Sequence, residues 1–502
     1  MSLKSNPDRW GVTNLRLAFP KKQNMFFKDL TFHYQKGEKI LLLGPSGSGK
    51  STLLQVLSGL VPKSIELPMK TDKLSVPESW GFIFQDPDTQ FCMPYADEEI
   101  AFVLENRRIP REDMARLIRH YLQMAGLSFA NPHQLISSLS GGMKQRLATA
   151  SILALEPDIL FLDEPTALLD PAGTEQLWQT VQRIGKDRTV LIVEHKIDQV
   201  LDFVERIVLF DDSGRIIADG PKSDVLHHHK KELDDYGIWY PGVWHAFEKK
   251  NPGNHSKNSM AAKPLLELDD FHVFRDRQVK FSLSHLIIHE GEWVAIIGEN
   301  GAGKSTMVEG IMGLVRHRGK VHWHLKNPAD EVAFVFQNPE YQFVTDRVDD
   351  ELGFNLVLKK RNRDEINERV DQTLTQFSLS NQRLQHPFQL SVGQKRRLSV
   401  ASSLIDNPKA VILDEPTFGQ DARNTFALLD LFQKLRQKGT TVLMITHEME
   451  VVRHFATRVL RIEKGRLVED FLQVPDNDGK GGVNGHALDE HGQAVFQNQS
   501  FL

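Results

Sequence analysis

The chain has 502 residues, enough for several domains, and 40 % hydrophobic and 25 % charged residues are ordinary values for a globular protein. The formal net charge of −5 argues against a protein whose main task is to bind a nucleic-acid backbone. The only cysteine, Cys92, excludes an intramolecular disulfide. The sequence shows neither a signal peptide nor a window of roughly 20 apolar residues for a membrane-spanning helix. We therefore expect a soluble intracellular protein that serves a membrane only through partners.

The first predicted elements are a buried strand at 39–44, KILLLG, then a glycine-rich loop and a helix from Lys50. A helical insert follows, because apolar residues recur there at the spacing of one helix face: Met114, Leu117, Ile118, Tyr121 and Leu122. The runs ILFLDEP at 159–165 and TVLIVEH at 189–195 are typical of parallel strands buried on both faces.

The same elements then recur in the same order. WVAIIG at 293–298 precedes a helix from Lys304, and VILDEP at 411–416 and TVLMITH at 441–447 match the later strands. The second insert has its own apolar stripe: Ile366, Val370, Leu374 and Phe377. These matches indicate a tandem duplication of about 230 residues rather than a solenoid, whose repeats are much shorter.

We predict a first domain at 1–228, a linker at 229–263, a second domain at 264–472 and a flexible tail at 473–502. The aromatic residues Trp239, Tyr240 and Trp244 near the join are expected to pack on their own domain, with a partner site as the alternative. A metal at His227–His229 is not expected, because no cysteine or carboxylate stands at ligand spacing.

Both glycine-rich loops match G-x-x-x-x-G-K-[ST], the pattern of a phosphate-binding loop. Backbone N–H groups and a helix N-terminus converge on phosphate oxygens there, the lysine reaches the β- and γ-phosphates, and the serine hydroxyl holds Mg²⁺. The predicted nucleotide-binding residues are Gly44, Pro45, Ser46, Gly47, Ser48, Gly49, Lys50, Ser51 and Thr52, and Gly298, Glu299, Asn300, Gly301, Ala302, Gly303, Lys304, Ser305 and Thr306.

Acidic pairs and histidines end the later strands, where they predict nucleotide hydrolysis. In each pair the aspartate suits Mg²⁺, and the glutamate can orient or deprotonate a water molecule. Each unit also has a histidine at the end of the next strand and a glutamine in a Phe-Gln pair, at 84–85 and 336–337. These side chains suit contacts that depend on the γ-phosphate. The predicted catalytic residues are Glu164, His195, Gln85, Glu415, His447 and Gln337. The predicted Mg²⁺ ligands are Ser51, Gln85, Asp163, Ser305, Gln337 and Asp414.

The order of phosphate loop, FQ, LSGG(Q), DEP and histidine resembles the ABC-type ATPases over nearly the whole chain. The family signature LSGGQ is similar to LSGGM at 139–143 and LSVGQ at 390–394. The resemblance implies an α/β fold with two tandem P-loop NTPase domains. Each has a mostly parallel sheet core, an antiparallel β part and a helical subdomain, and binds ATP with Mg²⁺.

In this family two such domains pack head to tail, and each ATP lies between one domain's loop and the other's signature. The resemblance therefore adds signature residues to both sites: Ser140, Gly141, Gly142, Ser391, Gly393 and Gln394. Met143 and Val392 depart from the usual Gln and Gly, and a β-branched Val392 predicts a slower site at Lys50. By position, Phe19 and Phe274 would stack on adenine.

FQDPDTQF at 84–91 and FQNPEYQF at 336–343 resemble the ATPases of energy-coupling-factor (ECF) importers, which drive vitamin and metal-ion uptake. This implies a peripheral place on the cytoplasmic face of the membrane, with a membrane T component and a substrate-binding S component as partners. Hydroxymethylpyrimidine or thiamine is the expected substrate, and cobalt or nickel is the alternative.

Acidic residues behind these motifs would contact basic groups of the T component, or would simply stabilise helix N-termini facing solvent: Asp97, Glu98, Glu99, Asp349, Asp350 and Glu351. A different reading is a soluble tandem ATPase that acts on ribosomes. Such proteins usually carry a long charged helical arm between their domains, whereas this join is short, so no nucleic acid is expected. A fused sugar-importer ATPase is a further alternative.

Overall fold

The computed structural model describes residues 8–20, 25–45, 47–167, 169, 171–250, 263–473, 485–488 and 494–496. The chain divides into two compact units, 1–243 with 421–423 and 244–420 with 424–502. The boundary falls inside the segment predicted as the linker. Among the described residues, no helix has both the length and the apolar character needed to cross a membrane.

The first unit is built on a six-stranded sheet in the order β10-β9-β3-β8-β7-β6. Its strands, and those of a smaller antiparallel sheet, are β1 (Arg9–Leu17), β2 (Phe27–Gln35), β3 (Lys39–Leu43), β4 (Met69–Lys70), β5 (Lys73–Ser75), β6 (Trp80–Ile83), β7 (Ile159–Asp163), β8 (Thr189–Val193), β9 (Arg206–Phe210) and β10 (Ile216–Pro221). Strands β6 to β8, β3 and β9 pair in parallel, and β10 is antiparallel to β9. The central strands β7 and β8 are buried throughout, which explains their continuous apolar sequences.

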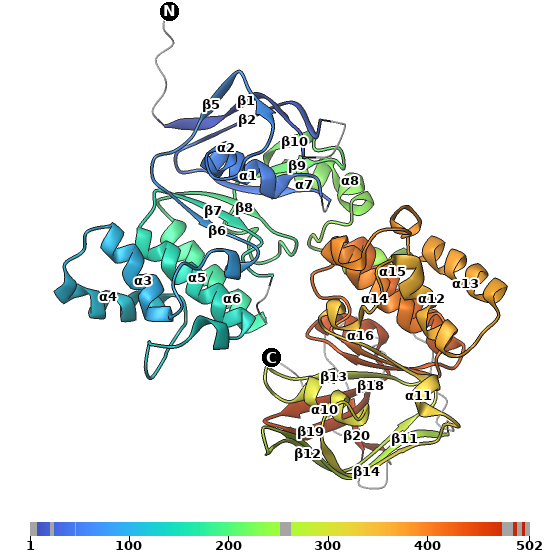
Figure 1. Cartoon of the computed structure of the whole chain (residues 1–502). Coiled ribbons are helices and arrows are strands. Elements are labelled where there is room, and N and C mark those ends of the chain that lie inside the picture. The colour runs from blue at the N-terminus through green and yellow to red at the C-terminus, as the bar shows by residue number, and fades with distance from the viewer. Residues whose placement is uncertain are drawn as a thin grey trace, which may run out of the picture. The chain divides into compact units, whose positions relative to one another are not determined.

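The helices of the first unit are α1 (Lys50–Ser58), α2 (Leu60–Lys63), α3 (Ala96–Asn106), α4 (Arg111–Met124), α5 (Gly141–Leu155), α6 (Pro171–Gly185), α7 (Lys222–His228) and α8 (Lys230–Asp235). Figure 1 shows α3 and α4 as a helical group set apart from the β1–β2 sheet of the same unit. The apolar stripe predicted at 114–122 packs there in one core with α3 and α5. The stripe therefore has the structural role that its spacing indicated.

The second unit repeats this plan in one larger sheet. Its strands are β11 (Pro264–Arg275), β12 (Gln278–His289), β13 (Trp293–Ile297), β14 (His317–Trp323), β15 (Val332–Val335), β16 (Ala410–Asp414), β17 (Thr441–Ile445), β18 (Arg458–Glu463), β19 (Arg466–Gln473), β20 (Gly485–Leu488) and β21 (Ala494–Phe496). The parallel strands β15, β16, β17, β13 and β18 correspond to β6, β7, β8, β3 and β9 of the first unit.

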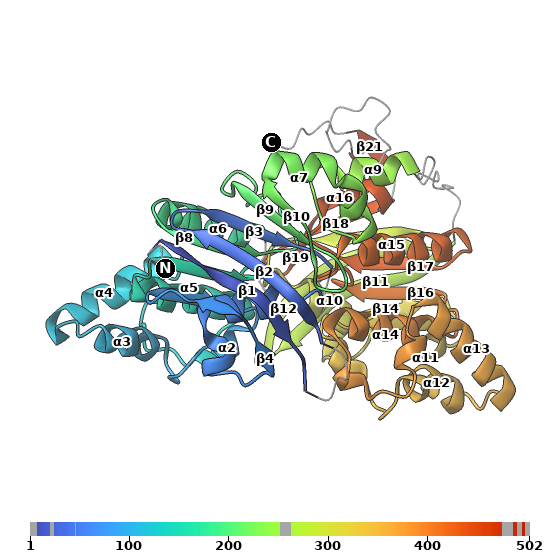
Figure 2. The same cartoon turned by 90° about the horizontal axis from the view of Figure 1, so that it is seen from above.

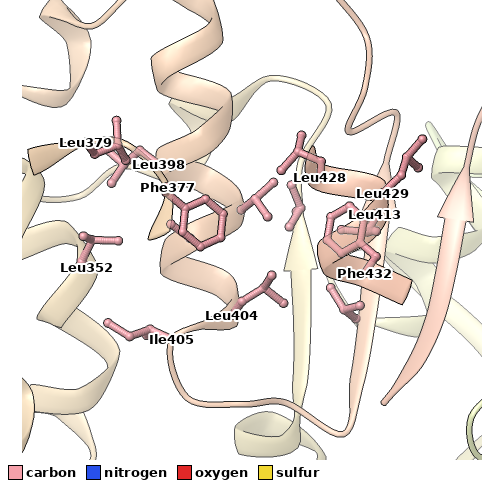
Figure 3. Close-up of a cluster of buried hydrophobic side chains, with 14 of the residues drawn as sticks. Leu352, Phe377, Leu379, Leu398, Leu404, Ile405, Leu413, Leu428, Leu429 and Phe432 are labelled. Carbon is pink, nitrogen blue, oxygen red and sulfur yellow. The ribbon is translucent and has the colours of Figure 1, made fainter. Parts of the chain in front are cut away.

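The helices of the second unit are α9 (Val243–Lys250), α10 (Lys304–Ile311), α11 (Pro328–Glu331), α12 (Val348–Leu358), α13 (Arg363–Gln376), α14 (Val392–Leu404), α15 (Ala422–Gln437) and α16 (Met449–Phe455). Figure 3 shows part of the core between the helical group and the sheet, with Phe377 and Leu398 near Leu379 and with Leu413 near Phe432. The predicted α/β fold with parallel sheet cores, antiparallel parts and helical subdomains is thus confirmed.

Helix α9, which lies in the predicted linker, packs on the second unit. The ring of Trp244 stacks on His454, with centroids 4.9 Å apart, and Phe247 stacks on Phe426 at 4.4 Å. Figure 2 shows α9 close to α16, which carries His454. Trp239 and Tyr240 instead contact residues of the first unit, namely Lys196 and Asp234. The aromatic residues of the join are therefore divided between the two units.

Most of the predicted tail lies outside the described residues. In the described part, β20 pairs with β19 and β21 pairs with β20, both antiparallel. The flexible tail thus stays a prediction.

Candidate functional site

Each phosphate loop lies between a buried central strand and a helix, β3 and α1 in the first unit and β13 and α10 in the second. The first glycine of each loop has a positive φ, 153° at Gly44 and 147° at Gly298. A Cβ at Gly298 would lie 2.2 Å from the carbonyl oxygen of Ile462, so only glycine fits there. Gly49 and Gly303 are also left-handed and directly precede the two helices.

The loop lysines take the same position in both units. Nζ of Lys50 donates to the carbonyl oxygens of Gly44 and Pro45 at 2.8 and 2.9 Å. Nζ of Lys304 donates to Gly298 and Glu299 at 2.7 and 2.9 Å. Burial lowers the pKa of Lys50 to about 8, although the nearby carboxylates of Glu164 and Asp163 oppose this. Each ammonium group therefore lies inside its loop, where a phosphate would need a cation.

The remaining loop positions stay predictions. Ser46 lies outside the described residues. The side chains of Ser51 and Ser305 both approach an aspartate at the end of another strand of the sheet, Asp163 on β7 and Asp414 on β16. Oγ of Ser51 donates to Oδ1 of Asp163 at 2.7 Å, and the side chain of Ser305 lies close enough to Asp414 to oppose the rise of its pKa.

These serine–aspartate pairs fit a divalent cation. Burial raises the pKa of Asp163 and of Asp414 to about 6, against the opposing effect of the serine bonds. Oδ1 of Asp414 is buried and has no hydrogen-bond partner among the described residues. Such an oxygen, next to a hydroxyl and at the foot of a phosphate loop, is a suitable ligand for Mg²⁺, which prefers oxygen donors.

Three predicted catalytic side chains meet in each unit. Glu164 is 2.9 Å from Nε2 of His195 and accepts a bond from Nε2 of Gln85 at 2.7 Å. In the second unit the corresponding distances from Glu415 are 2.8 Å to His447 and 3.3 Å to Gln337. The sequence motifs thus come together as two equivalent clusters, each within one unit.

Both glutamates have a strained backbone. The φ angle is 48° at Glu164 and at Glu415, in the left-handed region that non-glycine residues rarely adopt. A backbone hydrogen bond to the neighbouring strand holds each one, from Glu164 to Val193 and from Glu415 to Ile445. Strain that is repeated at matching positions is typical of functional residues.

The charges of the first cluster are mutually stabilising. Burial raises the pKa of Glu164, but the bond from His195 and the charge of Lys50 outweigh it, so the pKa lies below its ordinary value. Burial likewise lowers the pKa of His195, but Glu164 outweighs it and the pKa is raised. Glu164 is therefore held as a carboxylate, the form that can accept a proton from water.

The signature sequences begin helices α5 and α14. Oγ of Ser391 accepts a bond from the backbone of Gln394 at 3.4 Å, and Oε1 of Gln394 accepts one from the backbone of Ser391 at 3.0 Å, which forms a capping box. Ser140 caps α5 through Met143 in one direction only. Val392 is the first helical residue of α14, and its side chain is 64 % exposed. Its β-branched side chain therefore fits the local backbone.

Two predicted adenine-stacking residues have partners of their own. Phe19 makes an edge contact with Phe26 at 5.2 Å between ring centroids, and the guanidinium of Arg316 lies 5.7 Å from the ring of Phe274. Their role toward adenine stays a prediction.

The acidic residues that follow the segments FQDPDTQF and FQNPEYQF in the sequence are of two kinds. Glu99 and Glu351 are buried and accept backbone N–H bonds, from Cys92 and Met93 and from Val344 and Thr345 respectively. These two glutamates therefore stabilise the preceding loops.

The other acids lie nearer to solvent. Asp97 contacts His133, and Asp349 binds Arg347 and Arg383. Glu98 and Asp350 occupy matching positions in the first turns of α3 and α12.

Sequence reasoning missed a threonine–glutamate bond beside each histidine. Thr166 donates to Glu194, which precedes His195, and Thr417 donates at 3.2 Å to Glu448, which follows His447. In the first unit the glutamate stands directly before the histidine in the sequence, whereas in the second unit it stands directly after it. A residue-by-residue comparison of EH at 194–195 with HE at 447–448 could have indicated that both units place a glutamate next to the histidine, in reversed order.

Two phosphate loops, each followed by a serine–aspartate pair and a glutamate–histidine–glutamine cluster, define a tandem P-loop ATPase. The ABC transporter family matches residues 27–167 and 282–418. The chain belongs to this family.

Its relatives include proteins of similar length. It is 36 % identical over 500 residues to a putative HMP/thiamine import ATP-binding protein of Bacillus subtilis (strain 168), covering 91 % of this chain and 90 % of the relative. It is 32 % identical over 526 residues to a putative ABC transporter ATP-binding protein of Methanosarcina mazei, covering 91 % and 88 %. The prediction of a tandem ABC-type chain is thus confirmed.

Among solved structures, the chain resembles that of the archaeal ribosome recycling factor aABCE1 in complex with the ribosomal stalk protein aP1. The TM-score is 0.61 at 19 % identity, covering 91 % of this chain and 92 % of the other. At this identity the likeness concerns the fold alone.

Proposed function

We propose that this chain is the ATP-hydrolysing, energy-coupling subunit of an ECF-type membrane importer for a vitamin or vitamin precursor such as hydroxymethylpyrimidine or thiamine. The observation that carries the proposal is the 36 % identity, across 91 % of the chain, to a protein named for HMP/thiamine import. Cobalt or nickel remains the alternative substrate. In this proposal residues 1–228 and 264–472 are the two ATPase domains.

Each unit supplies the residues that hydrolysis needs. Lys50 and Lys304 would bind the β- and γ-phosphates, and Glu164 and Glu415 would accept a proton from the attacking water. Ser51, Asp163, Ser305 and Asp414 would hold Mg²⁺, which neutralises phosphate charge when it is bound. The side chains of Gln85 and Gln337 contact the catalytic glutamates. A movement of either glutamine would therefore shift the carboxylate that accepts the proton from water.

Two complete clusters on one chain support a pair of ATP sites. Following the family pattern, the loop at Lys50 would work with the signature at Ser391, and the loop at Lys304 with the signature at Ser140. Both units retain the glutamate and the histidine, so we propose that both hydrolyse ATP.

The membrane partners would contact the helical groups near α3 and α12. In the second unit, apolar side chains are exposed just before α12, with Tyr341 76 % and Val344 64 % exposed. Asp350 lies in the first turn of that helix. Exposed apolar groups beside acidic ones suit an amphipathic helix with basic residues, as a cytoplasmic segment of a T component would present. The chain would then be peripheral, on the cytoplasmic face of the membrane.

The experiment is affinity purification from detergent-solubilised host membranes followed by mass spectrometry. A multi-span T-type protein together with a second, substrate-binding membrane protein is the expected result. Ribosomal proteins without an integral membrane partner would overturn the importer in favour of a translation factor. The likeness to aABCE1 does not favour that alternative, because it extends to the fold only.

A further inference from the structure

A buried arginine follows the signature sequence of the second unit. Arg396 lies on α14, two residues after Gln394, and is only 4 % exposed. Its Nη1 donates to the carbonyl oxygen of Phe336 at 2.7 Å, and its Nη2 donates to that of Gln337 at 2.5 Å. One guanidinium group therefore holds two successive backbone carbonyls of the segment that carries the glutamine of the site.

The first unit has no equivalent link among its described residues. Gln145 occupies the matching position on α5 and is fully buried. Its Nε2 donates to the carbonyl oxygen of Phe84 at 3.4 Å, and its Oε1 has no hydrogen-bond partner among the described residues. A single long bond from an uncharged amide thus replaces two short bonds from a cation.

The difference in strength follows from the chemistry of the two side chains. Hydrogen bonds from a charged donor are about twice as strong as those between neutral groups, and the planar fork of arginine fixes two acceptors at once. Burial lowers the pKa of Arg396 to about 10, against the opposing charges of Asp414 and Glu415, so the group is charged at neutral pH.

The held segment leads directly to the catalytic glutamate. The backbone of Gln337 is fixed by Arg396, and the side chain of Gln337 bonds Glu415 at 3.3 Å. Arg396 also lies on the helix that begins at the signature serine, Ser391. A continuous path within the second unit therefore runs from the signature helix through Arg396 and Gln337 to Glu415.

We propose that Arg396 is a positioning residue that couples the signature helix of the second unit to its Gln337–Glu415 contact, and that the first unit lacks this rigid coupling. The two ATP sites then differ in their coupling. The site at Lys304 responds to movement of the helical subdomain of the second unit, and the site at Lys50 responds more weakly to movement of the helical subdomain of the first unit. This inference rests on the ATPase activity in the proposed function and not on the transported substrate.

Hydrogen exchange without nucleotide tests the coupling directly. In Arg396→Gln, peptides covering 333–343 should exchange at least threefold faster, while peptides covering 81–91 stay unchanged. The reciprocal Gln145→Arg should slow exchange in 81–91. The matched control is Arg436→Gln, a buried arginine on α15 whose Nε bonds Gln433. Faster exchange spread over the whole second unit, or equal effects of R396Q and R436Q on 333–343, would overturn the proposal.

Steady-state ATP hydrolysis distinguishes positioning from general stability. In a Glu164→Gln background, which leaves the second glutamate as the base, R396Q should lower kcat about tenfold with little change in KM. Arg396→Lys should recover part of this rate, because an ammonium can reach one carbonyl but not both in the same fork. A loss that appears only in KM, or only in thermal stability, would contradict the proposed role. If the chain did not hydrolyse ATP at all, the proposed function would fail, whereas the exchange result would still decide the coupling.

Discussion

At the scale of single residues, each glutamate proposed as catalytic combines a strained backbone with two side-chain partners. Glu164 and Glu415 have φ angles of 48°, and each contacts a histidine and a glutamine. A left-handed conformation costs a non-glycine residue about 1–3 kcal/mol, which the surrounding bonds must offset. This arrangement occurs in both units, which indicates that the local fold holds the glutamate carboxylate in one defined position.

Replacing these glutamates should separate hydrolysis from binding. Glu164→Gln together with Glu415→Gln removes both bases but keeps the size and part of the hydrogen bonding, so we expect ATP hydrolysis to fall about a hundredfold or more. Binding of a fluorescent ATP analogue should stay within about threefold, since the phosphate loops are untouched. Glu105→Gln, at an exposed position of α3, is the control. Unchanged hydrolysis in the double variant would rule out these residues as the bases.

The Glu164–His195 pair makes stability depend on pH. The pKa of His195 is raised above 6.5, so its contribution is complete below that value and is lost as pH rises through the folded pKa. The pKa of Glu164 is lowered below 4.5, so its contribution is complete above that value and is lost as pH falls through the folded pKa. The pair therefore stabilises the first unit most between these two values.

His195→Gln should accordingly reduce the stability of the first unit more at pH 5.5 than at pH 8.5. Hydrogen exchange of peptides covering β7 and β8 at the two pH values, corrected for the intrinsic pH dependence of exchange, measures this difference between wild type and variant. A larger effect at pH 8.5 would show that the two groups are not an ion pair.

At the scale of elements, α9 ties the join to the second unit. Phe247→Ala removes a ring stacked on Phe426 and in contact with Phe455, and burial of this kind contributes about 3 kcal/mol. We expect faster hydrogen exchange in α15 and α16, with little change in β3 and α1. His245→Ala, an exposed change on the same helix, is the control. Equal effects of both substitutions would mean that α9 does not stabilise the second unit.

How much the sequence could predict differs between elements. Strands, loops and the Glu–His–Gln clusters follow from local patterns, because buried parallel strands are continuously apolar and their carboxyl ends meet at one edge of the sheet. The packing of α9 could not be predicted, since an aromatic cluster in a join has no periodicity that selects one partner. The role of Glu351 could not be predicted either. An acidic residue in the first turn of a helix gives the same sequence pattern whether it faces solvent or accepts backbone hydrogen bonds from the preceding loop.

At the scale of the whole molecule, the position of each acid decides how partner docking should be tested. Glu98 and Glu351 both belong to the acidic residues that the sequence offered as partner contacts, but Glu351 is buried and accepts bonds from the Val344 and Thr345 backbone and from the Thr345 hydroxyl. A substitution there would leave buried donors unpaired, at a cost of about 1–3 kcal/mol. Loss of assembly in such a variant would therefore not reveal a contact with a partner. The position that matches Glu98 is Asp350.

Charge reversal at Glu98 and Asp350 should release the chain from its membrane partners. Glu98→Lys with Asp350→Lys places repulsive charges at the two proposed docking surfaces, and we expect at least a tenfold loss of chain recovered with washed host membranes. Added salt should weaken the binding of the wild type more than the remaining binding of the variant, because salt screens the attraction in the first and the repulsion in the second. Nucleotide binding and the melting temperature should stay close to wild type, because neither residue is in a phosphate loop or a core. Asp364→Lys with Glu112→Lys, in the first turns of α13 and α4, is the matched control. Full recovery of the reversed variant with membranes would show that α3 and α12 do not dock the chain through their acidic first turns.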